Sequence, residues 1–515
     1  MKATLSTQLA ALLAALLQAL PASGQSVPVA KTNPLPVFMH YMPWFDTPAT
    51  LGGSNWGYHW KFNNKNPSIV DAAGKRQIAS HYYPKIGPYA SNDPNVIEYH
   101  MLLMKLSGVD GVMLDWYGVQ GANGDVGSLL TNSNAAIAKV DDFGLKFGVV
   151  MEDRFSTVSI SNTTPDINKG KANMAYLRDN YFNNPNYIRL SATSGPLVGV
   201  FGPIRFQTPA QWTEILGQAG ENVDFNTLWY EKNDAGANAD GEYAWIYEDG
   251  ALNNHLSHQS NFYQFRAPTL GTAGGVAYPG FDDFYQEGGT GTVIGFEIPH
   301  NNGQTLTNTL SLAGQYGANI DYLQLATFND FGEGTMFEPT VETGFNYLHQ
   351  IQMFTGARDP VTNRPLDESD LQTVYELYLA RTKYAGNATI QALLNQVSTL
   401  LTSMQIGAAQ TQLAQASPAG DYNADGLVTL LDYTFWRSKF GTSTIIYGSG
   451  ADGNYDGAIN AADYLVWRNS FDALAGGAGF AAAGVPEPTT AAFLGLAAIM
   501  LCCRRVKRSN DGVES

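Results

Sequence analysis

Residues 322–335 read YLQLATFNDFGEGT, and this stretch decides the fold class and the chemistry that we expect. The apolar run Tyr322–Ala326 predicts a buried strand. Two carboxylates, Asp330 and Glu333, follow where that strand should reach the surface, and Asn329 precedes them. Paired acids in such a place are typical of acid/base chemistry on a neutral polymer.

The region from Pro28 to Gly356 alternates short β-rich runs with helical segments. Helices are expected at Asp93–Leu106, which opens with an N-cap Asp followed by Pro, and at Thr305–Tyr316. Eight strands alternating with helices predict an α/β fold, a (β/α)8 TIM-like barrel over residues 28–356, whose strand C-terminal ends carry the chemistry. The expected strands are Val37–Tyr41, Gly111–Asp115, Lys146–Met151, Leu197–Phe201, Thr227–Tyr230, Tyr243–Tyr247, Thr272–Tyr278 and Tyr322–Thr327.

Composition restricts the partners of the chain. Its 515 residues carry a formal net charge of -17, and only 15% of them are charged, so nucleic acid is an unfavourable partner. Low charge with many Trp and Tyr suits uncharged, hydroxyl-rich ligands, although an ordinary acidic secreted protein has the same composition. The two cysteines, Cys502 and Cys503, lie in the C-terminal tail, so we expect no disulfide or thiol metal site in the globular part.

The chain ends predict targeting. Residues 1–24 have an apolar core behind Lys2 and are typical of a secretory signal peptide. At the other end, a Gly/Ala linker (473–484) leads to residues 485–508, where Pro-Glu-Pro, a short apolar stretch and an Arg cluster resemble a PEP-CTERM sorting signal. That resemblance implies export, transient membrane anchoring and removal of the tail by sorting machinery at the cell envelope; a plain membrane anchor is the alternative.

Between barrel and tail lie two further segments. Residues 357–418 predict a helical extension or spacer, with no chemical signal. Residues 420–471 contain two copies of an EF-hand-like loop, 31 residues apart, with oxygen ligands at positions 1, 3, 5, 9 and 12, Gly at 6 and a carbonyl at 7. The expected calcium ligands are Asp421, Asn423, Asp425, Leu427, Thr429 and Asp432 in the first loop, and Asp452, Asn454, Asp456, Ala458, Asn460 and Asp463 in the second.

These tandem loops, closed by Asp and followed by a helix on one side only, resemble a type I dockerin. The resemblance implies calcium as a cofactor and a cohesin-type module as a partner.

The barrel region contains a series of motifs in a fixed order: Tyr41-Met42-Pro43-Trp44-Phe45, Gly57-Tyr58-His59-Trp60, the run Ser80–Pro94, Val96-Ile97, His100-Met101, Asp115-Trp116-Tyr117-Gly118, the run Asn329–Thr335 and Glu338-Pro339. In these motifs it resembles the endo-α-mannosidases and α-1,3-glucanases of glycoside hydrolase families 99 and 71. The resemblance implies a (β/α)8 barrel that cleaves internal α-linkages of a polysaccharide or glycan, with no cofactor for catalysis.

One departure leaves the sugar open. The mannosidases carry Asn-Glu-Trp-His-Glu-Gly where this chain has Asn-Asp-Phe-Gly-Glu-Gly, and the glucanases carry the more similar Asn-Asp-Tyr-Gly-Glu. By match to the family, Glu333 is the general acid and Asp330 the general base. Asp is one methylene shorter than Glu, which displaces the carboxylate by about 1.5 Å. Two stereochemical outcomes therefore stay open: net retention, in which the base activates a hydroxyl of the substrate, and inversion, in which it activates a water.

Other residues are candidates for binding the substrate. Glu152 resembles a family Glu that contacts sugar hydroxyls, and Asp115 ends a strand where the mannosidases have Ser; a structural role is as compatible with each. Aromatic rings that could stack on pyranose faces, or pack in the core, are Tyr41, Trp44, Trp60, His81, Tyr82 and Trp116, and Asn329 completes the set.

Three functions compete: an endo-acting α-glycoside hydrolase with a calcium-binding module, a non-catalytic glycan-binding protein on a hydrolase-like barrel, and an envelope structural protein. For the acid pair itself, the alternative is that Asp330 only caps a helix and Glu333 is solvated.

Overall fold

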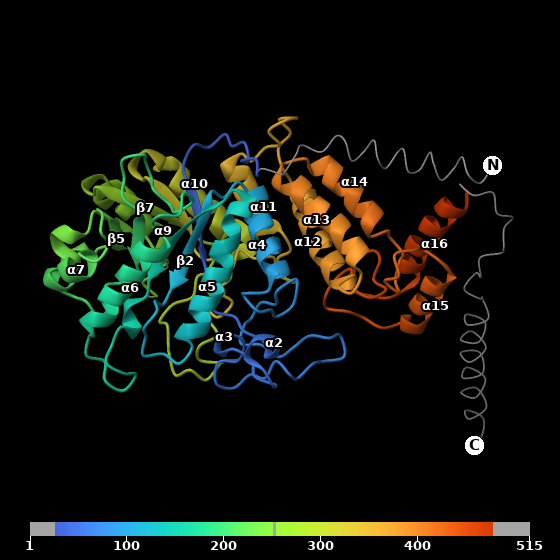
Figure 1. Ribbon diagram of the computed structural model, residues 1–515, viewed down its shortest axis with the longest axis horizontal. Coiled ribbons are helices and arrows are strands. Elements are labelled where there is room, and N and C mark those ends of the chain that lie inside the picture. Colours follow the sequence, from blue (N-terminus) through green and yellow to red (C-terminus); the bar gives the residue numbers. More distant parts are fainter. Residues whose placement is uncertain (1–25, 251–253, 477–515) are drawn as a thin grey trace, which may run out of the picture.

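The computed structural model describes residues 26–250 and 254–476. The predicted signal peptide and sorting tail therefore lie outside the described residues. Eight parallel strands close into one barrel in chain order, and each strand pairs with its neighbours in sequence (Figure 1). The strands are β1 (Val37–Tyr41), β2 (Gly111–Trp116), β3 (Lys146–Met151), β4 (Leu197–Val200), β5 (Asp224–Leu228), β6 (Gly241–Tyr243), β7 (Thr272–Ala277) and β8 (Tyr322–Leu325).

The predicted barrel is confirmed, with two strands displaced. β5 begins at Asp224 and β6 at Gly241, both earlier than the sequence pattern indicates. A Cβ at Gly241 would lie 1.8 Å from the carbonyl oxygen of Thr272, so only glycine lets β6 approach β7 at this position. Close packing between strands thus overrides the stronger β-propensity of residues 243–247.

Helices surround the barrel and follow most strands. In α4 the side chain of Asp93 accepts a hydrogen bond from Asn95 N (2.8 Å), and Pro94 occupies the first turn, as predicted. The helices of this region are α2 (Pro48–Leu51), α3 (Tyr58–Lys61), α4 (Pro94–Leu106), α5 (Val126–Val140), α6 (Ile167–Asn180), α7 (Pro209–Leu216), α8 (Lys232–Ala235), α9 (His255–Asn261), α10 (Gln304–Gln315) and α11 (Asn346–Thr355).

A helical region extends from the barrel along the long axis of the molecule (Figure 1). The predicted helical stretch consists of three helices, and Asn387 caps the second by accepting a hydrogen bond from Ile390 N (3.2 Å). The elements are α12 (Glu368–Lys383), α13 (Ala388–Thr402) and α14 (Ile406–Ala416), followed by α15 (Leu430–Lys439) and α16 (Ala461–Gly476) of the C-terminal module. Because α16 continues to Gly476, the predicted linker cannot begin at residue 473.

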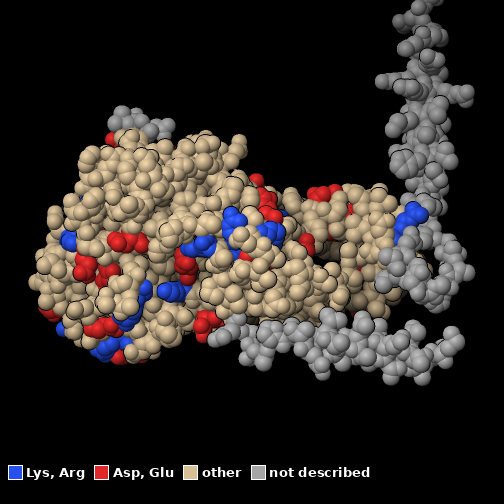
Figure 2. Space-filling view, turned by 90° about the horizontal axis from the view of Figure 1, so that it is seen from above, with Lys and Arg blue, Asp and Glu red and all other residues tan. Residues whose placement is uncertain are grey.

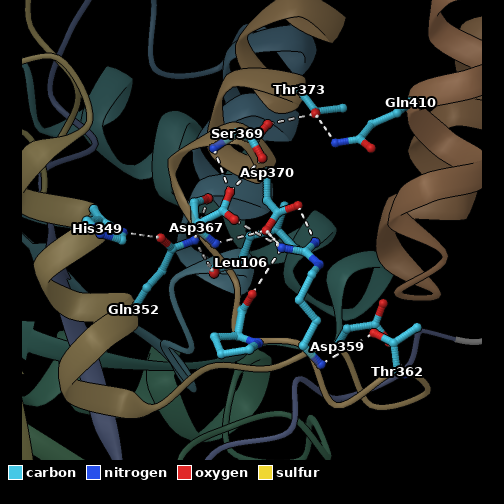
Figure 3. Close-up of polar contacts among 12 residues, drawn as sticks. Leu106, His349, Gln352, Asp359, Thr362, Asp367, Ser369, Asp370, Thr373 and Gln410 are labelled. Atoms are coloured by element: carbon cyan, nitrogen blue, oxygen red, sulfur yellow. Dashed lines mark hydrogen bonds and ion pairs between the residues drawn. The ribbon is translucent and has the colours of Figure 1, made fainter.

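The extension is packed on the barrel, which decides between the two readings of this segment. Gln352 of α11 donates hydrogen bonds to Leu106 O at the end of α4 (3.1 Å) and to Asp367 O (3.2 Å), the residue that caps α12 (Figure 3). On the outer side Arg381 of α12 makes two 2.9 Å bonds to Glu98 of α4.

Uncharged residues dominate the face shown in Figure 2, where basic and acidic side chains are interspersed. Within the described ranges, none of the helices has the length and apolarity that a membrane crossing requires.

Candidate active site

The loop after β8 presents both predicted acids in a fixed geometry. Thr327 Oγ1 lies 2.9 Å from Thr335 Oγ1 and accepts a hydrogen bond from Asp330 N (2.9 Å), and Asp330 Oδ1 accepts one from Glu333 N (2.9 Å). Gly334 follows at φ 66°, and a Cβ there would lie 2.6 Å from Asp282 O. The turn is therefore restricted to glycine at the residue next to Glu333.

Asp330 and Glu333 line one cavity of about 530 Å³ at the C-terminal ends of the strands. Asp115 of β2 and Glu152, which follows β3, line the same cavity. Asp330 is 3% exposed and Asp115 is 4% exposed, so these carboxyls are removed from bulk water. The remaining lining includes His40, Met42, Trp44, Tyr58, His59, Phe62, Tyr117, Arg154, Phe155, Phe201, Trp245 and Tyr285.

Burial and mutual repulsion favour the neutral form of these acids. Burial raises the pKa of Asp330 well above its ordinary value, and the charge of Glu333 adds to the effect. Burial also raises the pKa of Glu333, against the opposing hydrogen bond from Tyr285 and the charge of Arg154. Burial and the charge of Glu152 raise the pKa of Asp115. The cavity therefore retains protons on its carboxyls at pH values where exposed acids are ionised.

Arg154 is the one Lys or Arg among the described residues that line the cavity. Its Nε donates to Glu152 Oε2 (2.9 Å), which moderates the effect of burial and leaves the pKa of Glu152 at about 7. The site is acidic overall and suits a neutral ligand that donates hydrogen bonds.

Two residues that the sequence reasoning did not single out contact the acids or the strand ends. Tyr285 Oη donates to Glu333 Oε1 (2.9 Å), and the segment that carries it is bonded to the acid loop through Phe284 N and Gly332 O (2.8 Å). His40 of β1 lies 2.7 Å from Gln324 Nε2 through Nδ1, and burial lowers its pKa to about 3, so it is neutral. His40 is inside a predicted strand and could have been found by its register position; Tyr285 has no comparable signal.

Of the predicted aromatic residues, Trp44 lines the cavity, where its ring stacks on His59 with centroids 4.0 Å apart. Its Nε1 is buried and has no hydrogen-bond partner among the described residues.

The other aromatic predictions are corrected by the structure. Three of these rings are fully buried in the core, and Tyr41 Oη and Trp60 Nε1 already bond to His100 Nδ1 (3.0 Å) and Tyr89 O (2.8 Å). Tyr41 and Trp116 stand at strand ends and turn toward α4 and α6, whereas Trp60 lies in α3, so all three have packing roles. His81 and Tyr82 contact Asp282 outside the cavity, at 2.9 and 3.4 Å.

Asn329 also lies outside the cavity lining and has a positioning role instead. Its side chain accepts from Met42 N (2.8 Å) and donates to Met42 O (3.0 Å) and Tyr89 Oη (3.1 Å). These bonds join the acid loop to the end of β1, next to Trp44.

The two predicted calcium loops share one backbone geometry. In the first, Asp432 accepts hydrogen bonds from Tyr422 N (2.8 Å) and Thr429 N (2.8 Å). In the second, Asp463 accepts them from the corresponding Gly453 N (2.7 Å) and Asn460 N (2.8 Å). The closing residue of each loop is thus held in the same way.

The sixth position of each loop is a glycine with positive φ, 88° at Gly426 and 79° at Gly457, as a tight ligand loop requires. In the described part of the chain, no three His, Cys, Asp or Glu side chains are gathered closely enough to hold a metal by themselves. Calcium would therefore also need the amide, hydroxyl and carbonyl oxygens of each loop.

Two parts of the chain match known protein families. Residues 34–234 match the profile of glycosyl hydrolase family 99, and residues 419–471 match that of the dockerin type I domain. The first match ends before the loop with Asp330 and Glu333.

Curated relatives include a glycoprotein endo-alpha-1,2-mannosidase of Mus musculus, 27% identical over 229 residues, which are 42% of this chain and 47% of that protein. That of Xenopus laevis is 26% identical over 203 residues, 36% of this chain and 42% of the relative. The chain thus spans less than half the length of these two relatives. A glycoprotein endo-alpha-1,2-mannosidase-like protein of Danio rerio is 23% identical over 343 residues, 59% of this chain and 71% of that protein.

Among solved structures, the GH99 endo-alpha-mannosidase from Bacteroides thetaiotaomicron superposes with a TM-score of 0.47 at 19% identity, covering 62% of this chain and 96% of that one. The sequence matches relate residues 34–234 to glycosyl hydrolase family 99 and identify residues 419–471 as a dockerin type I domain.

Proposed function

We propose that this protein is an endo-acting α-glycoside hydrolase that cleaves internal α-linkages of an α-mannan or α-glucan. One observation carries the proposal: Asp330 and Glu333 come from a single rigid turn and line the same cavity, in which burial raises the pKa of both. The relation of residues 34–234 to glycosyl hydrolase family 99 supports the same reaction class.

Glycosidic cleavage proceeds through an oxocarbenium-like state and needs one proton donor and one proton acceptor. Glu333 supplies the proton to the leaving oxygen, the role that its match to the family's second acid implies, and Tyr285 Oη fixes its orientation. Asp330 is assigned the acceptor role by its match to the family's first acid. Burial raises its pKa further than that of Glu333, so it must release its proton before it can act, and the hydrogen bond from Glu333 N to its Oδ1 (2.9 Å) favours that ionised form. When Asp330 ionises, its charge further favours the protonated form of Glu333.

Asp115, Glu152 and Trp44 are proposed to hold the sugar. The two carboxyls face the cavity beside the acids, and Asp115 Oδ2 is buried without a hydrogen-bond partner among the described residues. A sugar hydroxyl would complete the hydrogen bonding of that oxygen. The indole of Trp44 adds an apolar wall and a free N–H donor.

The C-terminal module is proposed to bind calcium in both loops and to engage a cohesin-type partner, in line with its dockerin type I match. With the expected signal peptide and sorting tail, the protein would be exported, anchored for a time in the membrane, and handled by sorting machinery at the cell envelope.

The test is a substrate panel. The purified protein is incubated with α-1,3-glucan, yeast mannan and other α-glycans, and released oligosaccharides are separated by chromatography. We expect oligosaccharides from at least one polymer. The anomeric form of the first product, read by NMR, distinguishes retention from inversion. Glycan retention without any product would instead indicate a binding protein, and neither retention nor product would contradict the proposal.

A further inference from the structure

We propose that Tyr384, at the end of α12, is an outer-sphere residue of the first calcium loop, so that calcium binding and docking of the C-terminal module on the extension stabilise each other. This inference rests on the calcium-binding role proposed above and is independent of the hydrolase reaction. The extension and the module lie next to each other at one end of the molecule (Figure 1).

Asp421 is the first ligand of the first loop, and only one of its two carboxylate oxygens has hydrogen-bond donors. Asp421 is 0% exposed, and its Oδ2 accepts hydrogen bonds from Gly426 N (2.9 Å) and from Tyr384 Oη (2.6 Å). Its Oδ1 is buried and has no partner among the described residues. A buried carboxylate oxygen without a donor is costly, and a cation in the loop would satisfy it.

The second loop has the same arrangement with a different donor. Asp452 Oδ2 accepts from Gly457 N (2.9 Å), the counterpart of Gly426, and from Gly448 N (2.9 Å). Gly448 belongs to the segment that joins the two loops, so this donor is part of the module itself. In the first loop the equivalent donor is the side chain of Tyr384, which belongs to the extension.

Further contacts hold the module in this position. Tyr375 Oη of α12 donates to Tyr447 O (2.7 Å), and Ile445 N donates to Ala73 O (2.9 Å) in the barrel region. A cavity of about 640 Å³ lies between α12, α14 and the module, and its lining includes both Asp421 and Asp452. Both first ligands therefore face the extension.

A donor that binds the second oxygen of a ligating carboxylate orients the first, and loss of such partners typically lowers metal affinity about 10–100-fold. Because coupling between two binding events is reciprocal, calcium in the first loop must strengthen the contact between Asp421 and Tyr384 by the same factor. Calcium would thus fasten the module to the extension in addition to ordering the loop.

The experiment is calorimetric titration of the full chain with calcium, in an Asp456→Ala background that removes the exposed ligand at position 5 of the second loop and isolates the first loop. We expect Tyr384→Phe to weaken the remaining site at least about 10-fold. Tyr187→Phe is the matched control, because it deletes the same atom where that hydroxyl bonds a backbone carbonyl, Leu197 O (3.0 Å), inside the barrel and apart from the module. The calcium affinity of the control should stay within about twofold of that of the parent, whereas loss of a residue that orients a ligand should lower it about 10-fold.

A second measurement tests whether calcium strengthens the contact between the module and the extension. Hydrogen exchange of the last turn of α12, residues 380–383, should slow when calcium is added, and this slowing should be reduced in Tyr384→Phe. Equal calcium affinities for Tyr384→Phe and its parent would overturn the proposal, as would equal losses in both Tyr variants. If the parent chain binds no calcium, the proposed calcium-binding role fails, and this inference fails with it.

Discussion

At the scale of single residues, Tyr285 affects the pH at which Glu333 loses its proton. The hydrogen bond from Tyr285 Oη stabilises the ionised carboxylate and lowers the pKa of Glu333. Tyr285→Phe removes that bond and therefore raises this pKa. If the protonated form is the active one, the loss of activity at high pH should move upward by roughly half to one pH unit, with kcat reduced several-fold. A pH–rate profile measures the shift; an unchanged or lowered limb would exclude Glu333 as the acid.

Glu152 makes the stability of the protein depend on pH. Its pKa is about 7 in the folded protein, above its ordinary 4.5. A raised pKa adds stability that is complete below pH 4.5 and is lost as the pH rises through 7, on the order of 3 kcal/mol. Glu152→Gln should remove this part of the decline.

Urea unfolding of both proteins at pH 5 and pH 8 measures the difference. The Glu152→Gln variant should lose less stability between the two values than the parent, and identical losses would contradict the assigned pKa.

Four site residues could be found from the sequence for one physical reason. Asp115, Glu152, Asp330 and Glu333 stand at or just after strand ends, and a closed parallel barrel brings those ends together. Their roles remain predictions. Tyr285 was missed because it lies in an irregular segment between β7 and β8, and only the folded backbone brings it to Glu333.

The aromatic candidates show what sequence position alone could not predict. Tyr41 and Trp116 are also near strand ends, but side chains alternate along a strand and theirs point outward, into the core between strands and helices. Position along the chain indicates which end of the barrel a residue occupies, and the alternation within the strand must be known to tell which side it faces.

At the scale of elements, the turn after β8 depends on Gly334. In Gly334→Ala the new Cβ would meet Asp282 O at 2.6 Å in a backbone conformation with φ 66°. The turn must then shift and move Glu333. We expect a loss of about 1–3 kcal/mol in stability and at least a 10-fold loss in kcat.

Gly407→Ala in α14 is the control for this substitution, because it has open space around its Cβ and lies in a helix. It should be neutral or stabilising by up to about 1 kcal/mol. Thermal unfolding and activity of the two variants test the pair, and an active, stable Gly334→Ala would show that the turn tolerates movement.

Most strands could be predicted, because the apolar runs bounded by turn residues in the sequence form the strands of the barrel. β1 and β3 have their predicted bounds. β6 was placed too late because Gly241 and Glu242 carry little strand propensity, and the close approach to β7 that requires Gly241 is a property of the assembled sheet.

At the scale of the whole molecule, Arg381 fastens the extension to the barrel. Its side chain is 8% exposed and bonds Glu98, which is 14% exposed, through two contacts of 2.9 Å. Arg381→Met leaves the Glu98 carboxylate half-buried without its partner and should cost roughly 3 kcal/mol. Arg178→Met breaks the exposed pair with Asp179 and should cost much less, because solvent screens that pair.

Urea unfolding monitored by circular dichroism compares the two variants. Equal effects would mean that the contact between α4 and α12 does not hold the molecule together. This ion pair joins residues 283 positions apart in the chain and has no local signal in the sequence.

The central claim is that Glu333 and Asp330 together cleave an α-glycosidic bond. The most direct measurement follows product release and glycan binding in parallel for the parent chain, Glu333→Gln and Asp330→Asn, on whichever polymer of the panel the protein retains. The account predicts that each variant binds the glycan as the parent does and releases product at least about 100-fold more slowly. Product release at the parent rate by either variant would contradict it.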